Sequence, residues 1–96
     1  MNKDWEIRLN KNVRKTLKKL GKGINQRLKT ALKKLEENPK LGKGLSGYSG
    51  FYSYRTGTPE GEYRIIYRLK REEELVLVDL IGPREEVYEI LKRKRD

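Results

Sequence analysis

Three runs of strand-forming residues in the second half of the chain place the strongest limit on the fold. They cover residues 51–56, 63–69 and 75–81, and polar connections of hairpin length separate them. This spacing predicts an antiparallel meander. The third run is apolar on both faces, as is typical of a central strand that helices cover on one side.

The first half of the chain predicts a short strand and two amphipathic helices. Trp5, Ile7 and Leu9 alternate with charged residues, which is the pattern of a strand with one buried face. Apolar residues then recur at spacings of three and four over residues 13–20 and 24–35. Each of these two segments therefore has one apolar helical face.

The connections and the last segment complete the predicted order of elements. Gly21 and Gly23 are expected to end the first helix. Residues 41–50 hold four glycines and two serines, which predicts a loop with Leu45 as its single anchor to the core. A last helix is predicted over residues 85–95. The order β-α-α-β-β-β-α predicts an α+β fold, a small antiparallel sheet with the N-terminal helical hairpin packed on one face and a short C-terminal helix.

Length and charge limit the domain count and the partner. With 96 residues, of which 34% are hydrophobic and 40% charged, the chain is expected to form a single domain, residues 1–96, with one thin core. Residues 1–45 hold fourteen lysines and arginines against four acids, whereas residues 46–96 hold ten of each. The whole net charge of +10 thus lies in the N-terminal half, and it favours a polyanion such as RNA, DNA or an acidic protein.

Missing residue types narrow the chemistry. The chain has no cysteine and no histidine, which removes disulfides, thiolate metal sites, the usual zinc ligand and the usual general base. We therefore expect no metal and no cofactor. No apolar run approaches a membrane span, so the sequence predicts a soluble, cytoplasmic protein.

Arginines in or directly after the predicted strands form a candidate phosphate site. If the meander pairs as expected, Arg55 and Arg64 lie near each other on adjacent strands, where like charges are unfavourable without an anion. Arg84 opens the last helix, and Tyr88 lies about one turn later on the same face. Arginine binds phosphate oxygens bidentately and keeps its charge. The alternative is that Arg64 and Arg68 are solvated, balanced by nearby acids, and that Tyr88 packs on the sheet.

The outer faces of the two N-terminal helices carry lysines that suit contacts with a phosphate backbone. The alternative is a charged face that only keeps the protein soluble, but the charge asymmetry favours a polyanion partner. The candidates for RNA contact are Lys15, Lys18, Lys19, Lys29, Lys33 and Lys34.

The basic helical hairpin and five further stretches carry a family resemblance. These stretches are Glu37-Asn38-Pro39, Lys43-Gly44-Leu45-Ser46-Gly47, Tyr52-Ser53-Tyr54-Arg55, Gly61-Glu62-Tyr63-Arg64-Ile65-Ile66-Tyr67, and Ile81-Gly82-Pro83-Arg84 with Val87-Tyr88. In this order they resemble the RelE/ParE superfamily of bacterial and archaeal toxins, and more closely its RelE-like, ribosome-dependent messenger RNA interferases. The resemblance spans nearly the whole chain.

The resemblance implies a toxin that enters the ribosomal A site, cleaves the message there without a metal, and is held inactive by an acidic antitoxin encoded nearby. Its partners would be messenger RNA and the ribosome with its 16S ribosomal RNA. The family's catalytic residues match Arg55, Arg64, Arg84 and Tyr88. An additional lysine of the family falls at Ser53, which is a departure and which we assign to RNA contact.

Proton transfer has several candidate groups. Some relatives place a histidine or a glutamate near the site, and here Glu62 or Glu85 could take that place, or Tyr88 could orient the 2′-hydroxyl. Two other functions share the fold. One is a ParE-like protein that inhibits DNA gyrase by binding, without catalysis. The other is a weakened toxin that acts mainly as an antitoxin-binding partner or corepressor.

Overall fold

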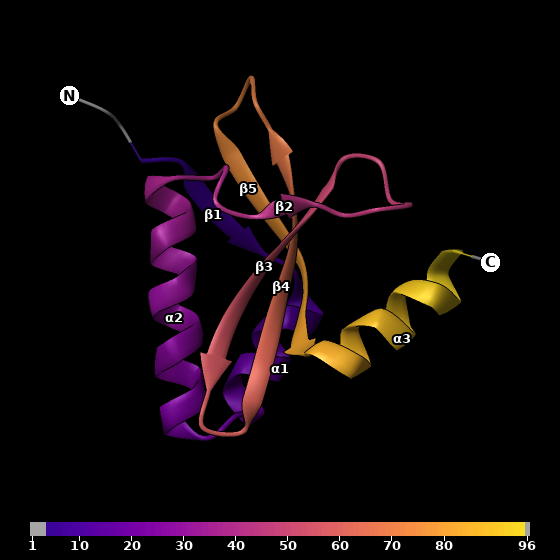
Figure 1. Cartoon of the computed structure of the whole chain (residues 1–96). Helices are drawn as coiled ribbons and strands as arrows, with labels where there is room; N and C mark the ends of the chain where they lie inside the picture. The colour runs from indigo at the N-terminus through magenta and orange to yellow at the C-terminus, as the bar shows by residue number, and fades with distance from the viewer. Residues whose placement is uncertain (1–3, 96) are drawn as a thin grey trace.

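The computed structural model describes residues 4–95, which form three helices and five strands. In chain order the elements are β1 (Glu6–Leu9), α1 (Lys11–Lys19), α2 (Lys22–Glu37), β2 (Lys43–Gly44), β3 (Phe51–Thr58), β4 (Gly61–Lys70), β5 (Leu75–Pro83) and α3 (Arg84–Arg95) (Figure 1). The predicted α+β class, the helical hairpin, the meander and the C-terminal helix are confirmed.

The sheet has the strand order β1-β5-β4-β3-β2, and it is mixed rather than wholly antiparallel. The meander β3-β4-β5 pairs antiparallel as predicted, but β1 runs parallel to β5, with Glu6 opposite Leu75 and Leu9 opposite Val78. The expectation of an antiparallel sheet is therefore wrong for β1. No tight turn joins β1 to β5, so hairpin geometry does not fix their relative direction.

The short strand β2 lies inside the segment that the sequence predicts as a loop. Lys43 pairs with Ser53 and Gly44 with Tyr52, which makes β2 the edge strand next to β3. Two residues are too few to show a strand periodicity, and for this reason the sequence gives no signal for β2. The buried side chain of Tyr67 fastens the segment before β2 to the sheet.

The Tyr67 hydroxyl donates to the carbonyl of Pro39 at 2.8 Å and accepts from the backbone N–H of Gly42 at 2.9 Å. A Cβ atom at position 42 would lie 2.5 Å from this hydroxyl oxygen, so only glycine fits there without movement of the ring. The ring of Tyr52 stacks on that of Tyr67 with centroids 5.6 Å apart.

The helix ends follow local hydrogen bonding. Asn10 caps α1, because its Oδ1 accepts from the Val13 N–H at 2.8 Å. Gly21 is the residue before α2, while Gly23 lies inside the first turn of α2 rather than in the connection. The prediction that Gly23 helps to end α1 is therefore wrong, since α1 ends at Lys19 and Gly23 already belongs to α2. The Asn25 side chain donates to the Leu17 carbonyl at 2.6 Å and so links the two helices.

Each face of the sheet carries its own buried cluster. Along β4, Tyr63, Ile65 and Tyr67 point to the helical hairpin, whereas Ile66 points to α3. Figure 1 shows α2 on one side of the strands and α3 extending on the other. Among residues 4–95, the hairpin-face core comprises Val13, Leu17, Ile24, Leu28, Ala31, Leu32, Leu35, Tyr63, Ile65, Tyr67, Val76, Val78 and Ile81. The α3-face core comprises Ile66, Val87 and Leu91.

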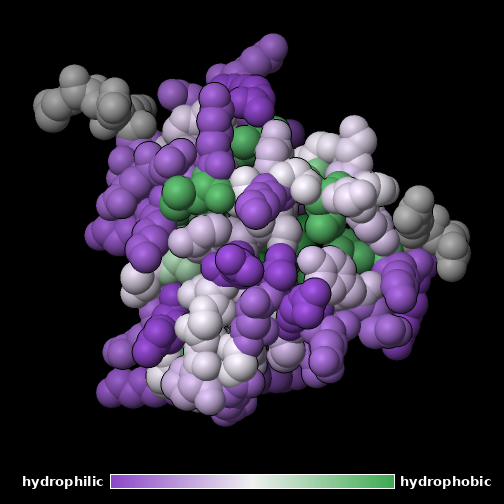
Figure 2. All heavy atoms as spheres, in the orientation of Figure 1, coloured by the Kyte–Doolittle hydropathy of each residue, from purple (hydrophilic) through white to green (hydrophobic). Residues whose placement is uncertain are grey.

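The surface seen in the same orientation is mostly hydrophilic, with a hydrophobic area between the loop after β2 and α3 (Figure 2). Leu45 and Tyr48 of that loop both pack against the α3-face core, so Leu45 is not its single anchor. Over the described part of the chain, the structure has no helix with the length and apolarity that a membrane span requires.

Candidate functional site

Arg55 on β3 and Arg64 on β4 are directly opposite each other in the sheet. Both lie on the face of the sheet that α3 partly covers. Tyr63 and Ile65 point to the helical hairpin, and Arg64, which lies between them in β4, therefore points to the opposite face. Arg55 is exposed, and among the described residues no acid pairs with it. The predicted juxtaposition of two like charges on adjacent strands is therefore present.

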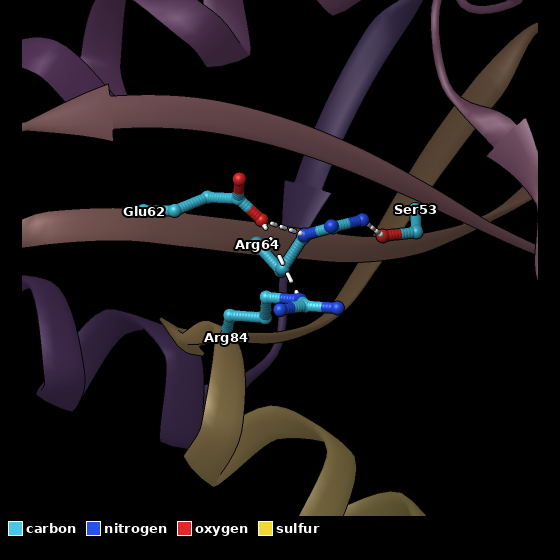
Figure 3. Close-up of polar contacts among 4 residues, drawn as sticks. All are labelled: Ser53, Glu62, Arg64 and Arg84. Carbon is cyan, nitrogen blue, oxygen red and sulfur yellow. Dashed lines mark hydrogen bonds and ion pairs between the residues drawn. The ribbon is translucent and has the colours of Figure 1, made fainter.

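The guanidinium of Arg64 is fixed on more than one side. Its Nε donates to Oε2 of Glu62 at 2.6 Å, and its Nη1 donates to Oγ of Ser53 at 3.4 Å (Figure 3). The Arg64 side chain is only 17% exposed, and its Cζ lies 5.8 Å from the ring centroid of Tyr88. Arg64 is thus ordered before any ligand arrives.

Arg84 reaches the same place from another element. It is the first residue of α3, and its Nε lies 3.9 Å from the same Oε2 of Glu62 that binds Arg64. Its Cζ is 5.9 Å from the Tyr88 ring centroid, and its side chain is 61% exposed. Glu62, Arg64, Arg84 and Tyr88 form one group, which we call the arginine cluster; Figure 3 shows its first three members.

A cleft of about 940 Å³ opens beside the arginine cluster, between β2, β3, β4 and α3. Its lining combines cations, hydroxyls and three aromatic rings, which is a composition suited to a nucleotide. Arg84 stands at its edge rather than in its lining. The lining residues are Leu41, Lys43, Gly44, Leu45, Ser46, Tyr48, Ser53, Tyr54, Arg55, Arg64, Tyr88 and Lys92.

Lys43 and Lys92 belong to the cleft although sequence reasoning did not select them. Lys43 lies on β2, opposite Ser53, and Lys92 lies on α3 one turn after Tyr88. Only the pairing of β2 with β3 brings Lys43 to the site, so no spacing in the sequence could reveal it. For Lys92, the helical spacing of four from Tyr88 is a usable signal.

Ser53 and the two candidate carboxylates differ in their environment. Ser53 is 8% exposed and lies under the Arg64 guanidinium, so any contact it makes to RNA is shared with that arginine. Glu62 is part of the arginine cluster, whereas Glu85 is exposed and lies outside the cleft lining.

The six helical lysines are exposed, but they lie apart from the cleft. The apolar faces of α1 and α2 cover the opposite side of the sheet, which leaves these lysines on the outer surface of the hairpin. The structure therefore unites Ser53, Arg55, Arg64, Arg84 and Tyr88, and places the lysines on a second, separate surface.

Arg68 is balanced by a nearby acid, which is the alternative that the sequence left open for it. Its Nε and Nη2 donate to the two carboxylate oxygens of Asp79 at 2.8 and 2.9 Å, and its Cζ lies 5.4 Å from the Phe51 ring centroid. The hydrogen bonds to Asp79 raise the pKa of Arg68. Asp79 is the extra residue of a bulge, since Ile66 pairs with Leu80 and the next residue of β4 with Val78.

Comparison with known proteins defines the class. Residues 7–88 match the family described as ParE toxin of type II toxin-antitoxin system, parDE. The chain belongs to this family, and thus to the RelE/ParE superfamily, which confirms the resemblance noted from the sequence. It is a toxin of a toxin–antitoxin pair. None of the curated proteins searched matches the sequence.

Among solved structures, the fold of this chain is similar to that of RelE toxins. The isolated RelE toxin of E. coli is 29% identical, with 93% of this chain and 97% of that one covered and a TM-score of 0.70. The RelBE2 toxin–antitoxin complex from Mycobacterium tuberculosis contains a chain that is 28% identical, with 84% and 99% covered and a TM-score of 0.72. The intact E. coli RelBE complex gives 25% identity, 82% and 95% coverage, and a TM-score of 0.70.

Proposed function

We propose that this toxin is a ribosome-dependent endoribonuclease that cleaves messenger RNA in the A site. The observation that carries the proposal is the cleft in which Arg55, Arg64 and Tyr88 meet beside Arg84. A phosphodiester that is attacked by its neighbouring 2′-hydroxyl gains negative charge at phosphorus, and preorganised cations lower that barrier. Arginines from two strands and a helix provide them.

Each residue of the site has a place in this reaction. Arg64, which its neighbours hold in place, and Arg84 stabilise the charge on the cleaved phosphate, and Arg55 assists from the opposite strand. Tyr88 orients the nucleotide by stacking on a base or binding the 2′-hydroxyl. Arginine serves this purpose better than lysine because its planar fork binds two phosphate oxygens at once.

Lysines of the cleft add a group that can donate a proton, which the arginines do not provide. Lys43 and Lys92 bring ammonium groups to the lining, and Lys43 lies across from Ser53. An ammonium is a compact cation that can also donate a proton, whereas a guanidinium in a protein does not give its proton up. We assign Lys43 to the phosphate and the leaving oxygen.

The helical lysines serve binding rather than the reaction. They lie on the far side of the sheet from the cleft, so they suit the 16S ribosomal RNA while the cleft holds the message. An acidic antitoxin is the expected protein partner, in keeping with the solved RelBE complexes of similar chains. A ribosomal substrate places the active toxin in the cytoplasm.

Cleavage on programmed ribosomes tests the proposal. We expect purified toxin to cut the message in the A site, and Arg64→Ala and Arg84→Ala to lower kcat by about 100-fold, as for the loss of one donor to a developing anion. Arg93→Ala is the matched control, because Arg93 is an exposed arginine on α3 outside the cleft lining. An intact message with the unaltered toxin would overturn the proposal.

A second function has one observation in its favour, namely that the matching family is that of ParE toxins. A ParE-like toxin would inhibit DNA gyrase by binding. Supercoiling by gyrase with added toxin separates the two functions: inhibition without message cleavage identifies the second function, and cleavage with normal supercoiling identifies the first.

A further inference from the structure

Glu62 is the acid of the arginine cluster, and it contacts both arginines of that cluster. Its Oε2 accepts from Nε of Arg64 at 2.6 Å and lies 3.9 Å from Nε of Arg84. Figure 3 shows one oxygen of this carboxylate joined to both arginines, with the Arg64 guanidinium extending away from it toward Ser53. A carboxylate at this place could compete with a phosphate or prepare the site for one.

We propose that Glu62 is a positioning residue, which fixes Arg64 and draws in Arg84 so that both are ready for the phosphate; this rests on the proposed endoribonuclease function. The atoms involved favour this role over competition. Glu62 binds Arg64 through Nε, at the stem of the guanidinium, and Ser53 accepts from Nη1. The remaining N–H groups of the fork stay available for phosphate oxygens.

Charge balance supports the same role. Arg55 and Arg64 are directly opposed, and Arg84 is beside them, so the three like charges repel one another without a nearby anion. One carboxylate relieves part of this repulsion. With Arg55, Arg64, Arg84, Lys43 and Lys92 in or beside the cleft, the site still keeps a positive excess for a phosphate.

Ordering before binding is the benefit to catalysis. An arginine side chain loses about 2 kcal/mol of conformational freedom when it is fixed, and a mobile arginine loses that freedom only when substrate binds. Arg64 is only 17% exposed and already held by Glu62 and Ser53, whereas the Arg84 side chain is 61% exposed and has the longer contact to Glu62 and a contact to the Tyr88 ring. The effect of Glu62 should therefore pass mainly through Arg64.

Two variants separate the hydrogen bond from the charge. Glu62→Gln keeps an acceptor oxygen and removes the charge, and Glu62→Ala removes both. On programmed ribosomes we expect Glu62→Ala to lower kcat by about 10-fold or more with KM within about threefold, and Glu62→Gln, which keeps the hydrogen bond but not the charge, to recover part of the loss. Glu60→Ala is the matched control, since Glu60 is an exposed acid just before β4 and outside the cleft lining.

A second measurement needs no cleavage and keeps the inference separate from the proposed function. In the free protein, the Arg64 Nε–H should give an NMR cross-peak protected from solvent exchange, which Glu62→Gln retains and Glu62→Ala loses. An unprotected Arg64 Nε–H in the unaltered protein would overturn the positioning role. So would a Glu62→Ala variant that cleaves as fast as the unaltered toxin, and a variant that cleaves faster would make Glu62 a competing anion.

The two failures have different signatures. If the unaltered toxin leaves the message intact, the endoribonuclease proposal fails, and the NMR result still decides whether Glu62 fixes Arg64. If the toxin cleaves and Glu62→Ala does not slow it, the endoribonuclease proposal stands and the positioning role fails. Thermal melts of the variants exclude misfolding as the cause of a lower kcat.

Discussion

The two faces of the sheet are built from the same strands but packed in different ways. Among the described residues, the hairpin-face core buries thirteen side chains, whereas the α3-face core buries three. The second face carries Ser53, Arg64 and the cleft where the first carries aliphatic and aromatic contacts. A thin sheet protein therefore gains its stability from one face and leaves the other for polar side chains.

Charge is also arranged differently on the two sides. The helical lysines are exposed on the hairpin, whereas two arginines of the other face are paired with acids, in the pairs Arg64–Glu62 and Arg68–Asp79. Dispersed cations attract a polyanion at long range, and paired arginines hold a defined geometry. The difference predicts binding from one surface and specific chemistry from the other.

Truncation of one leucine in each core tests the packing difference. Leu28 is fully buried in the hairpin-face core, and Leu91 is 7% exposed in the α3-face core. We expect Leu28→Ala to lower the free energy of unfolding by about 3–5 kcal/mol and Leu91→Ala by about 2 kcal/mol, because the cost depends on how completely the removed atoms were enclosed. Urea denaturation measures both, and equal losses would refute the comparison.

The Tyr67 hydroxyl allows a test of how much the hydrogen bonds between the hairpin-face core and the segment before β2 stabilise the protein. Tyr67→Phe removes the partner of the Pro39 carbonyl and of the Gly42 N–H, so we expect a loss of about 1–2 kcal/mol in the free energy of unfolding. Tyr52→Phe is a suitable control, because within residues 4–95 the one hydrogen bond of the Tyr52 hydroxyl is an exposed bond from Arg71. If the two variants are equally stable, the bonds to Tyr67 add nothing.

Substitution of two exposed lysines, one on each face of the sheet, separates an effect on the cleavage step from an effect on RNA binding. If the proposed function holds, Lys43→Ala should lower kcat on ribosomes by about 10-fold, since Lys43 lines the cleft. Lys29→Ala should leave kcat unchanged, raise KM by about twofold and make the salt dependence of binding less steep, as expected for a phosphate contact. A fall in kcat for Lys29→Ala would contradict the division between the faces.

Alkaline pH should lower the free energy of unfolding by a small amount through two tyrosines of the hairpin-face core. Burial raises the pKa of Tyr63 and Tyr67 above the ordinary value of 10.0, with Glu60 and Glu86 adding to the effect on Tyr63. The unfolded chain therefore loses these protons first. Their contribution to stability is fully present below about pH 10 and is lost as the pH rises through the folded-state pKa values. Tyr67→Phe should show a shallower decline between pH 9 and 11 in denaturation experiments, and an unchanged decline would remove Tyr67 as a cause.

Periodicity in the sequence was enough to predict the helices, the meander and the opposition of Arg55 and Arg64, because these depend on local spacing and on hairpin pairing. The direction of β1 was not predictable, since it depends on a partner distant in the chain. The existence of β2 was not predictable because two residues are too few to show a strand periodicity. Lys43 could not be assigned for the same reason. Glu62 had a weak signal, because it precedes Arg64 by two residues and so shares its face of the strand.

The tie between Tyr67 and the segment before β2 has a dynamic consequence. The amide of Gly42 can exchange with solvent only when its bond to the Tyr67 hydroxyl opens, and the next residue along the chain is Lys43, which begins the edge strand. Residues 39–44 should therefore open and close as one cooperative unit whose protection against hydrogen exchange reports on the core. The width of the cleft is then set by a local equilibrium, and warming should loosen its β2 wall well before the protein unfolds.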